Sequence, residues 1–166
     1  MKKVTLIFFC ILLPLLGASQ DSLKELLTLH NSKSIPYITV KELKTSKNDV
    51  ILFDARELVE YQTSHLKGAI HVGYDFFEIN KIVNQNIPKD SKIVVYCSLG
   101  IRSEDISEKL KEFGYTNIYN LYGGIFEWKN DGNEVVDMNE KETNKVHAFS
   151  KEWGKWLYKG KKVYKR

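Results

Sequence analysis

Cys97 lies where an apolar segment ends and a segment with helical periodicity begins, which is a setting for thiol chemistry. Residues 93–96 are β-branched or aromatic without polar alternation, which predicts a strand covered on both faces in a parallel sheet. Apolar residues recur at helical spacing over residues 102–113, and Gly114 follows as a stop. Cys97 is therefore predicted to lie at the carboxyl end of a strand, in a loop that leads into a helix N-terminus.

This position favours the thiolate form of Cys97. A helix N-terminus offers unpaired N–H groups and a partial positive charge, and Arg102 adds a permanent cation. Gly100 permits a tight turn, and the short side chains of Ser98 and Ser103 leave room for backbone amides that face the sulfur. A lone cysteine is otherwise most simply a small buried apolar residue, but this loop favours a reactive nucleophile.

The first 19 residues predict a secretory signal peptide. Two lysines precede an apolar run over residues 4–16, which is short for a membrane span, and small residues follow at 17–19. We expect the mature chain to begin at Gln20, with cleavage after Ala18 or an uncleaved anchor as alternatives. The protein is thus predicted to be exported, either periplasmic or secreted.

Removal of that segment leaves Cys97 as the only cysteine, so any resolving thiol must come from outside the chain. The formal charge falls from +4 to +2 without Lys2 and Lys3, with 23 basic against 21 acidic residues, which is too mild to indicate nucleic-acid binding. The four histidines show no metal-binding spacing, and a single cysteine cannot form a thiolate metal site. We expect no metal and no organic cofactor.

Strands and helices alternate along most of the chain, after a short lead-in helix. This alternation predicts an α/β domain with a mainly parallel sheet. The expected strands are 35–40, 50–53, 68–72, 93–96 and 117–121, and the expected helices are 21–30, 41–45, 57–64, 74–85, 102–113 and a last one after Gly124.

Four stretches in this order resemble single-domain rhodanese-type sulfurtransferases, over about residues 35–132. They are Asp54–Arg56 with Glu60 and Tyr61, residues 65–70 (HLKGAI), residues 97–103 (CSLGIRS) and residues 123–128 (GGIFEW). The resemblance implies a five-stranded parallel sheet between two helical layers, α/β/α. Ser64, where the family often has glycine, and residues 71–73 depart from the family pattern without touching the sulfur loop.

The resemblance also implies how the site works. Cys97 would carry a sulfane sulfur as a persulfide, taken from a small donor such as thiosulfate or a persulfide and passed to an external thiol or protein. The loop whose amides surround the sulfur would comprise Ser98, Leu99, Gly100, Ile101, Arg102 and Ser103. Asp54, Arg56 and His65 are expected to give structural support, the first two as an ion pair and His65 through a backbone hydrogen bond near the following strand.

Two other functions use the same features. A cysteine, an amide cradle and an arginine also make a phosphatase, but the phosphatases that resemble this fold have five residues between cysteine and arginine. Here four intervene between Cys97 and Arg102, and the smaller loop favours a single sulfur atom. A non-catalytic binding module is the third possibility, which family members become when the cysteine is lost.

The chain is thus predicted to comprise a signal peptide (1–19), a helical lead-in (20–34), a rhodanese-like domain (35–132) and a basic extension (133–166). Residues 138–166 hold nine Lys or Arg and three Glu. Apolar residues at 146, 149, 153, 156 and 157 predict an amphipathic helix over residues 146–159. We expect its apolar face to dock on the domain; weak contact of residues 146–166 with an anionic membrane or a protein is the alternative.

Overall fold

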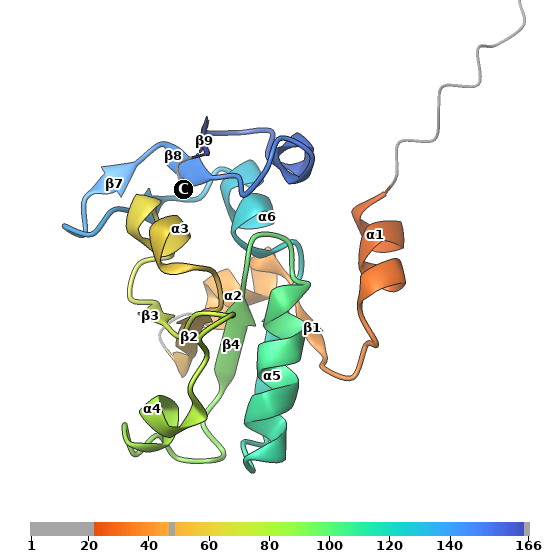
Figure 1. Ribbon diagram of the computed structural model, residues 1–166, viewed down its shortest axis with the longest axis vertical. Helices are drawn as coiled ribbons and strands as arrows, with labels where there is room; N and C mark the ends of the chain where they lie inside the picture. The colour runs from red at the N-terminus through yellow and green to blue at the C-terminus, as the bar shows by residue number, and fades with distance from the viewer. Residues whose placement is uncertain (1–21, 47–48, 165–166) are drawn as a thin grey trace, which may run out of the picture.

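The computed structural model describes residues 22–46 and 49–164 (Figure 1). The predicted signal peptide lies outside the described residues. Five strands, all paired in parallel, form one sheet in the order β1-β5-β4-β2-β3. The strands are β1 (Tyr37–Ile38), β2 (Ile51–Asp54), β3 (Ile70–His71), β4 (Ile93–Tyr96) and β5 (Ile118–Leu121).

Strand β4 lies at the centre of the sheet, and all four of its side chains are fully buried. Their faces alternate: Val94 and Tyr96 pack into one apolar cluster, whereas Ile93 and Val95 pack into another. This accounts for the uninterrupted apolar run before Cys97, because both faces of the strand need apolar side chains.

Helices cover both faces of the sheet. They are α1 (Leu23–His30), α2 (Val40–Ser46), α3 (Leu58–Thr63), α4 (Ile79–Val83), α5 (Arg102–Glu112) and α6 (Gly124–Asn130). Helices α2 and α6 contribute to the cluster of Val94, whereas α4 and α5 contribute to the cluster of Val95. The predicted three-layer α/β/α fold with a five-stranded sheet is confirmed.

The segment before β4 differs from its prediction. A mostly buried helix was expected over residues 74–85, but α4 covers only Ile79–Val83, and Phe76 is 85% exposed. Gly73 takes a φ of +75°, and the Tyr74 hydroxyl donates a hydrogen bond to Asp105 at 2.6 Å, so the chain runs as a loop toward α5. Leu58, an apolar residue at the start of α3, is also exposed.

The prediction of an amphipathic helix over residues 146–159 is wrong. The extension instead forms an antiparallel pair, β6 (Val135–Val136) with β7 (Glu142–Thr143), and a parallel pair, β8 (Lys145–His147) with β9 (Lys161–Val163). One short 3₁₀ helix, η2 (Trp153–Trp156), lies between β8 and β9. Phe149 adopts a φ of +59°, which no α-helix contains, so the apolar spacing belongs to a segment whose backbone is not helical.

The extension nevertheless docks on the domain. Val146, Ala148 and Leu157 are fully buried, and with Trp156 they belong to the same apolar cluster as Val94. This interface brings the last part of the chain over the carboxyl end of β4 and beside α6 (Figure 1). Among residues 22–46 and 49–164, no helix has the length and apolar character needed to cross a membrane.

Candidate functional site

Cys97 follows directly after β4, and α5 begins five residues later at Arg102. The backbone N–H of Gly100 donates a hydrogen bond to the Cys97 Sγ atom at 3.1 Å, and the Ser103 hydroxyl lies 3.6 Å from the same sulfur. The loop therefore wraps around the sulfur, and the N-terminal end of an eleven-residue helix lies beside it.

Helix α6 holds the backbone of the cysteine. The N–H of Ile125 donates to the Cys97 carbonyl at 2.9 Å, and that of Phe126 donates to the Ser98 carbonyl at 3.2 Å. Gly124 makes this approach possible: its φ is +54°, and a Cβ there would lie 2.3 Å from the Cys97 carbonyl oxygen. Gly124 thus makes room for the cysteine loop.

Two asparagines fix the turn at Gly100. Its carbonyl accepts hydrogen bonds from the side-chain amides of Asn120 at 2.8 Å and Asn31 at 2.7 Å. Asn120 lies on β5 and also accepts from Ser103 at 2.7 Å, whereas Asn31 is the C-cap of α1. The lead-in helix therefore contacts the sulfur loop. Asn31 and Gly100 are 69 positions apart, so nothing in the sequence indicates this contact.

Arg102 is paired with a buried glutamate. Its two terminal nitrogens donate to the carboxylate of Glu60 on α3 at 2.7 and 2.9 Å, and the Ser98 hydroxyl donates to the same carboxylate at 3.1 Å. Glu60 is only 1% exposed. The sequence showed Glu60 within a family motif but gave it no role; the available signal was an acidic residue on the inward face of a short helix.

These charges set the ionisation of the site. Burial acts to raise the pKa of Cys97, but the Arg102 charge and the hydrogen bonds from Ser103 and Gly100 outweigh it, and the net pKa lies below that of an ordinary thiol. Burial likewise acts to raise the pKa of Glu60, and its hydrogen bonds and attraction to Arg102 bring it below the usual range. The geometry thus favours a thiolate beside a paired arginine.

Asp54 and Arg56 form an ion pair at 2.6 Å, with both side chains fully buried. Arg56 also donates to the Ser64 carbonyl at 2.7 Å, so the pair ties the end of β2 to the end of α3. Neither residue lines the pocket at Cys97. The structure thus contains the ion pair expected between these two residues.

His65 contacts a backbone carbonyl, as expected, but that carbonyl belongs to the preceding helix. Its Nδ1 lies 3.1 Å from the Tyr61 carbonyl of the preceding helix α3, not near the following strand, and its ring stacks on Tyr61 with centroids 4.0 Å apart. Its backbone pairs with Val136 through two hydrogen bonds of 2.9 Å. His65 therefore connects α3 to the C-terminal extension.

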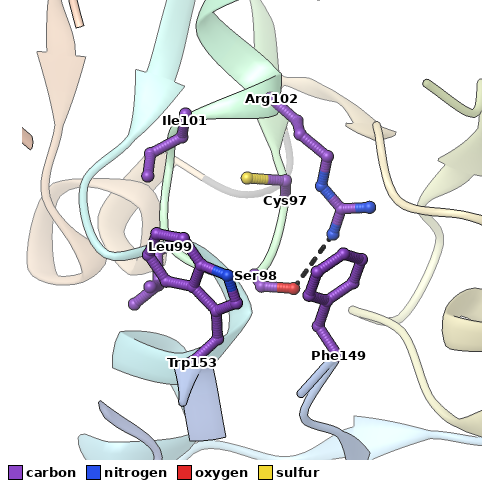
Figure 2. A pocket seen from close by; sticks show the side chains of 7 residues that line it. All are labelled: Cys97, Ser98, Leu99, Ile101, Arg102, Phe149 and Trp153. Carbon is purple, nitrogen blue, oxygen red and sulfur yellow. Dashed lines mark hydrogen bonds between the residues drawn. The ribbon is translucent and has the colours of Figure 1, made fainter. Parts of the chain in front are cut away.

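A pocket of about 200 Å³ opens beside the sulfur (Figure 2). The predicted loop supplies five of its walls, and the extension supplies two that sequence reasoning missed, Phe149 and Trp153. The lining residues are Cys97, Ser98, Leu99, Ile101, Arg102, Phe149 and Trp153. Gly100 and Ser103 do not line the pocket but contact the sulfur, at 3.1 Å from the Gly100 nitrogen and 3.6 Å from the Ser103 hydroxyl. In the described ranges, no cluster of three or more His, Cys, Asp or Glu residues could hold a metal ion.

Comparison with known proteins places this arrangement in a family context. A tRNA uridine(34) hydroxylase of Aster yellows witches'-broom phytoplasma is 34% identical over 112 residues, which cover 64% of this chain but only 36% of that protein. The thiosulfate sulfurtransferase GlpE of Coxiella burnetii is 29% identical over 97 residues, 58% of this chain and 87% of that one.

A solved structure gives the same result. The crystal structure of a rhodanese-related protein from Thermoplasma volcanium aligns with a TM-score of 0.50 and 26% identity, and covers 61% of this chain and 97% of that one. Residues 39–131, more than half of the chain, match the rhodanese-like domain family. On this match, and on the predicted fold that the structure confirms, the protein belongs to the rhodanese-like domain family.

Proposed function

We propose that this protein is a sulfurtransferase that carries a sulfane sulfur on Cys97. The observation that carries the proposal is the Gly100 N–H at 3.1 Å from Sγ, in a loop that also holds Arg102 and a helix N-terminus. Such a site stabilises negative charge on a sulfur and, after transfer, on the outer sulfur of a persulfide.

The proposed reaction has two displacements. The Cys97 thiolate attacks the outer sulfur of the donor, a new S–S bond forms, and the donor bond breaks with its electron pair on the leaving group, such as sulfite or a thiolate. A thiolate acceptor then attacks the outer sulfur, and the Cys97 thiolate leaves. Both leaving groups are stable anions, so neither step needs a general acid.

The sulfurtransferase relative supports this proposal more strongly than the hydroxylase does. The match covers 87% of the length of the Coxiella burnetii protein, but only 36% of the phytoplasma protein. Sulfur transfer by a single rhodanese-like domain therefore needs nothing beyond the part that is shared, whereas the rest of the hydroxylase has no counterpart in the alignment.

The loop length argues against phosphoryl transfer. Four residues separate Cys97 from Arg102, and Arg102 is held by Glu60 at 2.7 and 2.9 Å, whereas a phosphate would need that guanidinium for its own oxygens. Turnover of an aryl phosphate at a rate comparable to that of a sulfane donor would overturn this preference.

The acceptor is proposed to be an external thiol in an exported setting. Cys97 is the only cysteine after residue 19, so no second thiol of the mature chain can release the sulfur. Cell fractionation with N-terminal sequencing tests export: we expect a mature chain that starts at Gln20, and a cytoplasmic chain that retains Met1 would contradict it.

Mass spectrometry tests the central step. After incubation with a sulfane donor, the intact protein should gain one sulfur atom at Cys97 and lose it on addition of a thiol or cyanide. The Cys97→Ser variant should neither gain the sulfur nor turn over. Unchanged turnover in that variant would refute the proposal.

A further inference from the structure

Two aromatic side chains from outside the sheet domain complete the pocket at Cys97. Phe149 follows β8, and Trp153 begins η2. Figure 2 shows both rings facing the loop that carries the sulfur, opposite Ile101 and Arg102. The wall that a donor meets as it approaches Sγ is therefore made partly by the extension, which we name the aromatic wall (Phe149 and Trp153).

The aromatic wall is held in place by specific contacts. The backbone N–H of Trp153 donates to the Ser150 hydroxyl at 3.2 Å, and the indole ring meets the His30 ring of α1 edge to face at 6.0 Å between centroids. Phe149 is 52% exposed at a φ of +59°, a conformation rare for a bulky residue, and its N–H donates to Nδ1 of His147 at 3.2 Å. A half-exposed ring in an unfavourable backbone conformation indicates a function at that position.

Among residues 22–46 and 49–164, Arg102 is the only cation that lines the pocket, and it is already paired. Arg102 donates to both oxygens of Glu60 at 2.7 and 2.9 Å, and its guanidinium carbon lies 5.2 Å from the centroid of the Phe149 ring. A doubly charged donor such as thiosulfate would have to compete with Glu60 for Arg102. The other lining side chains, apart from Ser98 and the thiol, are apolar.

We propose that the pocket selects organic sulfane donors with one apolar substituent over inorganic thiosulfate, and that Phe149 and Trp153 determine this specificity. The inference rests on the proposed sulfur transfer and specifies its donor class. The pocket of about 200 Å³ exceeds the cavity of about 150 Å³ that accommodates benzene in an apolar protein interior. The volume is therefore sufficient for a phenyl-sized substituent beside the sulfur.

A thiosulfonate anion, R–SO₂–S⁻, represents this class. The Cys97 thiolate attacks its outer sulfur, the Sγ–S bond forms, and the S–S bond of the donor breaks with the electron pair on the sulfinate. The products are Cys97–S–S⁻ and R–SO₂⁻, so atoms and charge balance without an added oxidant or reductant. The substituent R lies against the aromatic wall during the attack.

Three donors separate charge from apolar contact. Thiosulfate carries two charges, methanethiosulfonate carries one, and benzenethiosulfonate carries one together with an aromatic ring. We measure the second-order rate constant for sulfur gain at Cys97 with each donor and divide it by the rate constant of that donor with free cysteine, which corrects for intrinsic reactivity. We expect this normalised rate constant to be about tenfold higher for benzenethiosulfonate than for methanethiosulfonate, the discrimination that an apolar pocket commonly provides.

Variants of the aromatic wall test the assignment. Phe149→Ala should reduce the ratio of the two thiosulfonate rates toward one, and Phe149→Leu should retain part of it. Phe76→Ala removes an aromatic ring that is 85% exposed and absent from the pocket lining, and it should leave the ratio unchanged. Trp153→Leu should also reduce the ratio. Because Trp153 packs on the core cluster, the thermal unfolding of this variant is compared with that of the wild type, so that loss of the fold is distinguished from loss of the wall.

The outcomes distinguish this inference from the proposed function. Sulfur gain from thiosulfate at a rate equal to that from benzenethiosulfonate, or a ratio that Phe149→Ala does not change, would overturn the donor class and leave sulfur transfer intact. Absence of sulfur gain from all three donors would overturn the proposed function itself.

Discussion

Arg102 and Glu60 are joined by two hydrogen bonds, from the two terminal nitrogens of the guanidinium to the two oxygens of the carboxylate. They come from α5 and α3, 42 positions apart, and meet at the mouth of the sulfur loop. The pair holds the guanidinium next to Cys97, and the Glu60 carboxylate balances most of the Arg102 charge. The guanidinium can therefore stabilise a thiolate without being an unpaired cation in the pocket.

Replacement of Glu60 by glutamine should destabilise the fold. Loss of the carboxylate leaves the Arg102 charge without its partner, and we expect the free energy of unfolding to fall by about 2–3 kcal/mol. This lies below the cost for a fully buried pair because the Arg102 side chain is 17% exposed. Urea unfolding measures the change, with Glu112→Gln at an exposed position of α5 as the matched control. Equal midpoints for the two variants would contradict the prediction.

Replacement of Arg102 by glutamine should raise the pKa of Cys97. In the wild-type protein burial raises this pKa and Arg102 provides the first of the opposing contributions, so its removal shifts the balance toward the neutral thiol. The rate of alkylation by iodoacetamide, measured against pH, should then rise at higher pH than in the wild type. At a fixed pH below the pKa of Cys97, each increase of that pKa by about one lowers the thiolate fraction about tenfold. Superimposable profiles would show that Arg102 does not stabilise the thiolate.

Replacement of Gly124 by alanine should disrupt the sulfur loop. The added Cβ would lie 2.3 Å from the Cys97 carbonyl oxygen, at a φ of +54°, so either the loop or α6 must move. Gly114→Ala is the matched control, because its φ is +86° and nothing lies within 4 Å of the added atom. We expect the control to cost about 1 kcal/mol, and Gly124→Ala to cost at least twice as much. Only Gly124→Ala should also slow alkylation of Cys97 in the folded protein.

Replacement of Arg56 by methionine should affect stability rather than reactivity. Arg56 and Asp54 are completely buried, and removal of one partner leaves the other charge uncompensated, at a cost of about 3–5 kcal/mol. Arg56 does not line the pocket, so the alkylation profile of the fraction that remains folded should match that of the wild type. A shift in that profile would give Arg56 a part in the chemistry.

The central part of the site could be predicted from local sequence. An apolar run buried on both faces, a short loop with Gly100 and a periodic segment after Arg102 together specify strand, loop and helix, and the structure has them at these residues. Each of these signals depends on neighbours within a few positions, where backbone preference and burial act directly.

The rest of the site depends on contacts between distant residues. The positions of Glu60 and Arg102 in the sequence do not indicate that they pair, because the distance between their side chains depends on how α3 and α5 are placed in the fold. The helix predicted over residues 146–159 failed for another reason. The spacing of Val146, Phe149 and Trp153 fits a helical face, but the chain forms a strand, an irregular segment and a 3₁₀ helix there, and Phe149 is 52% exposed. Apolar spacing does not reveal a residue with positive φ, and Phe149 at +59° interrupts any α-helix through this segment.

The two asparagine amides on the Gly100 carbonyl connect the loop around the Cys97 thiol to the N-terminal helix. Gly100 has the greatest backbone freedom in the loop, and Asn120 with Asn31 restrains it before any substrate arrives, so its N–H already points at Sγ. Because Asn31 caps α1, undocking of that helix would release one of the two restraints. We therefore expect the alkylation rate of Cys97 to change when α1 leaves its place against the loop, without a label on the helix itself.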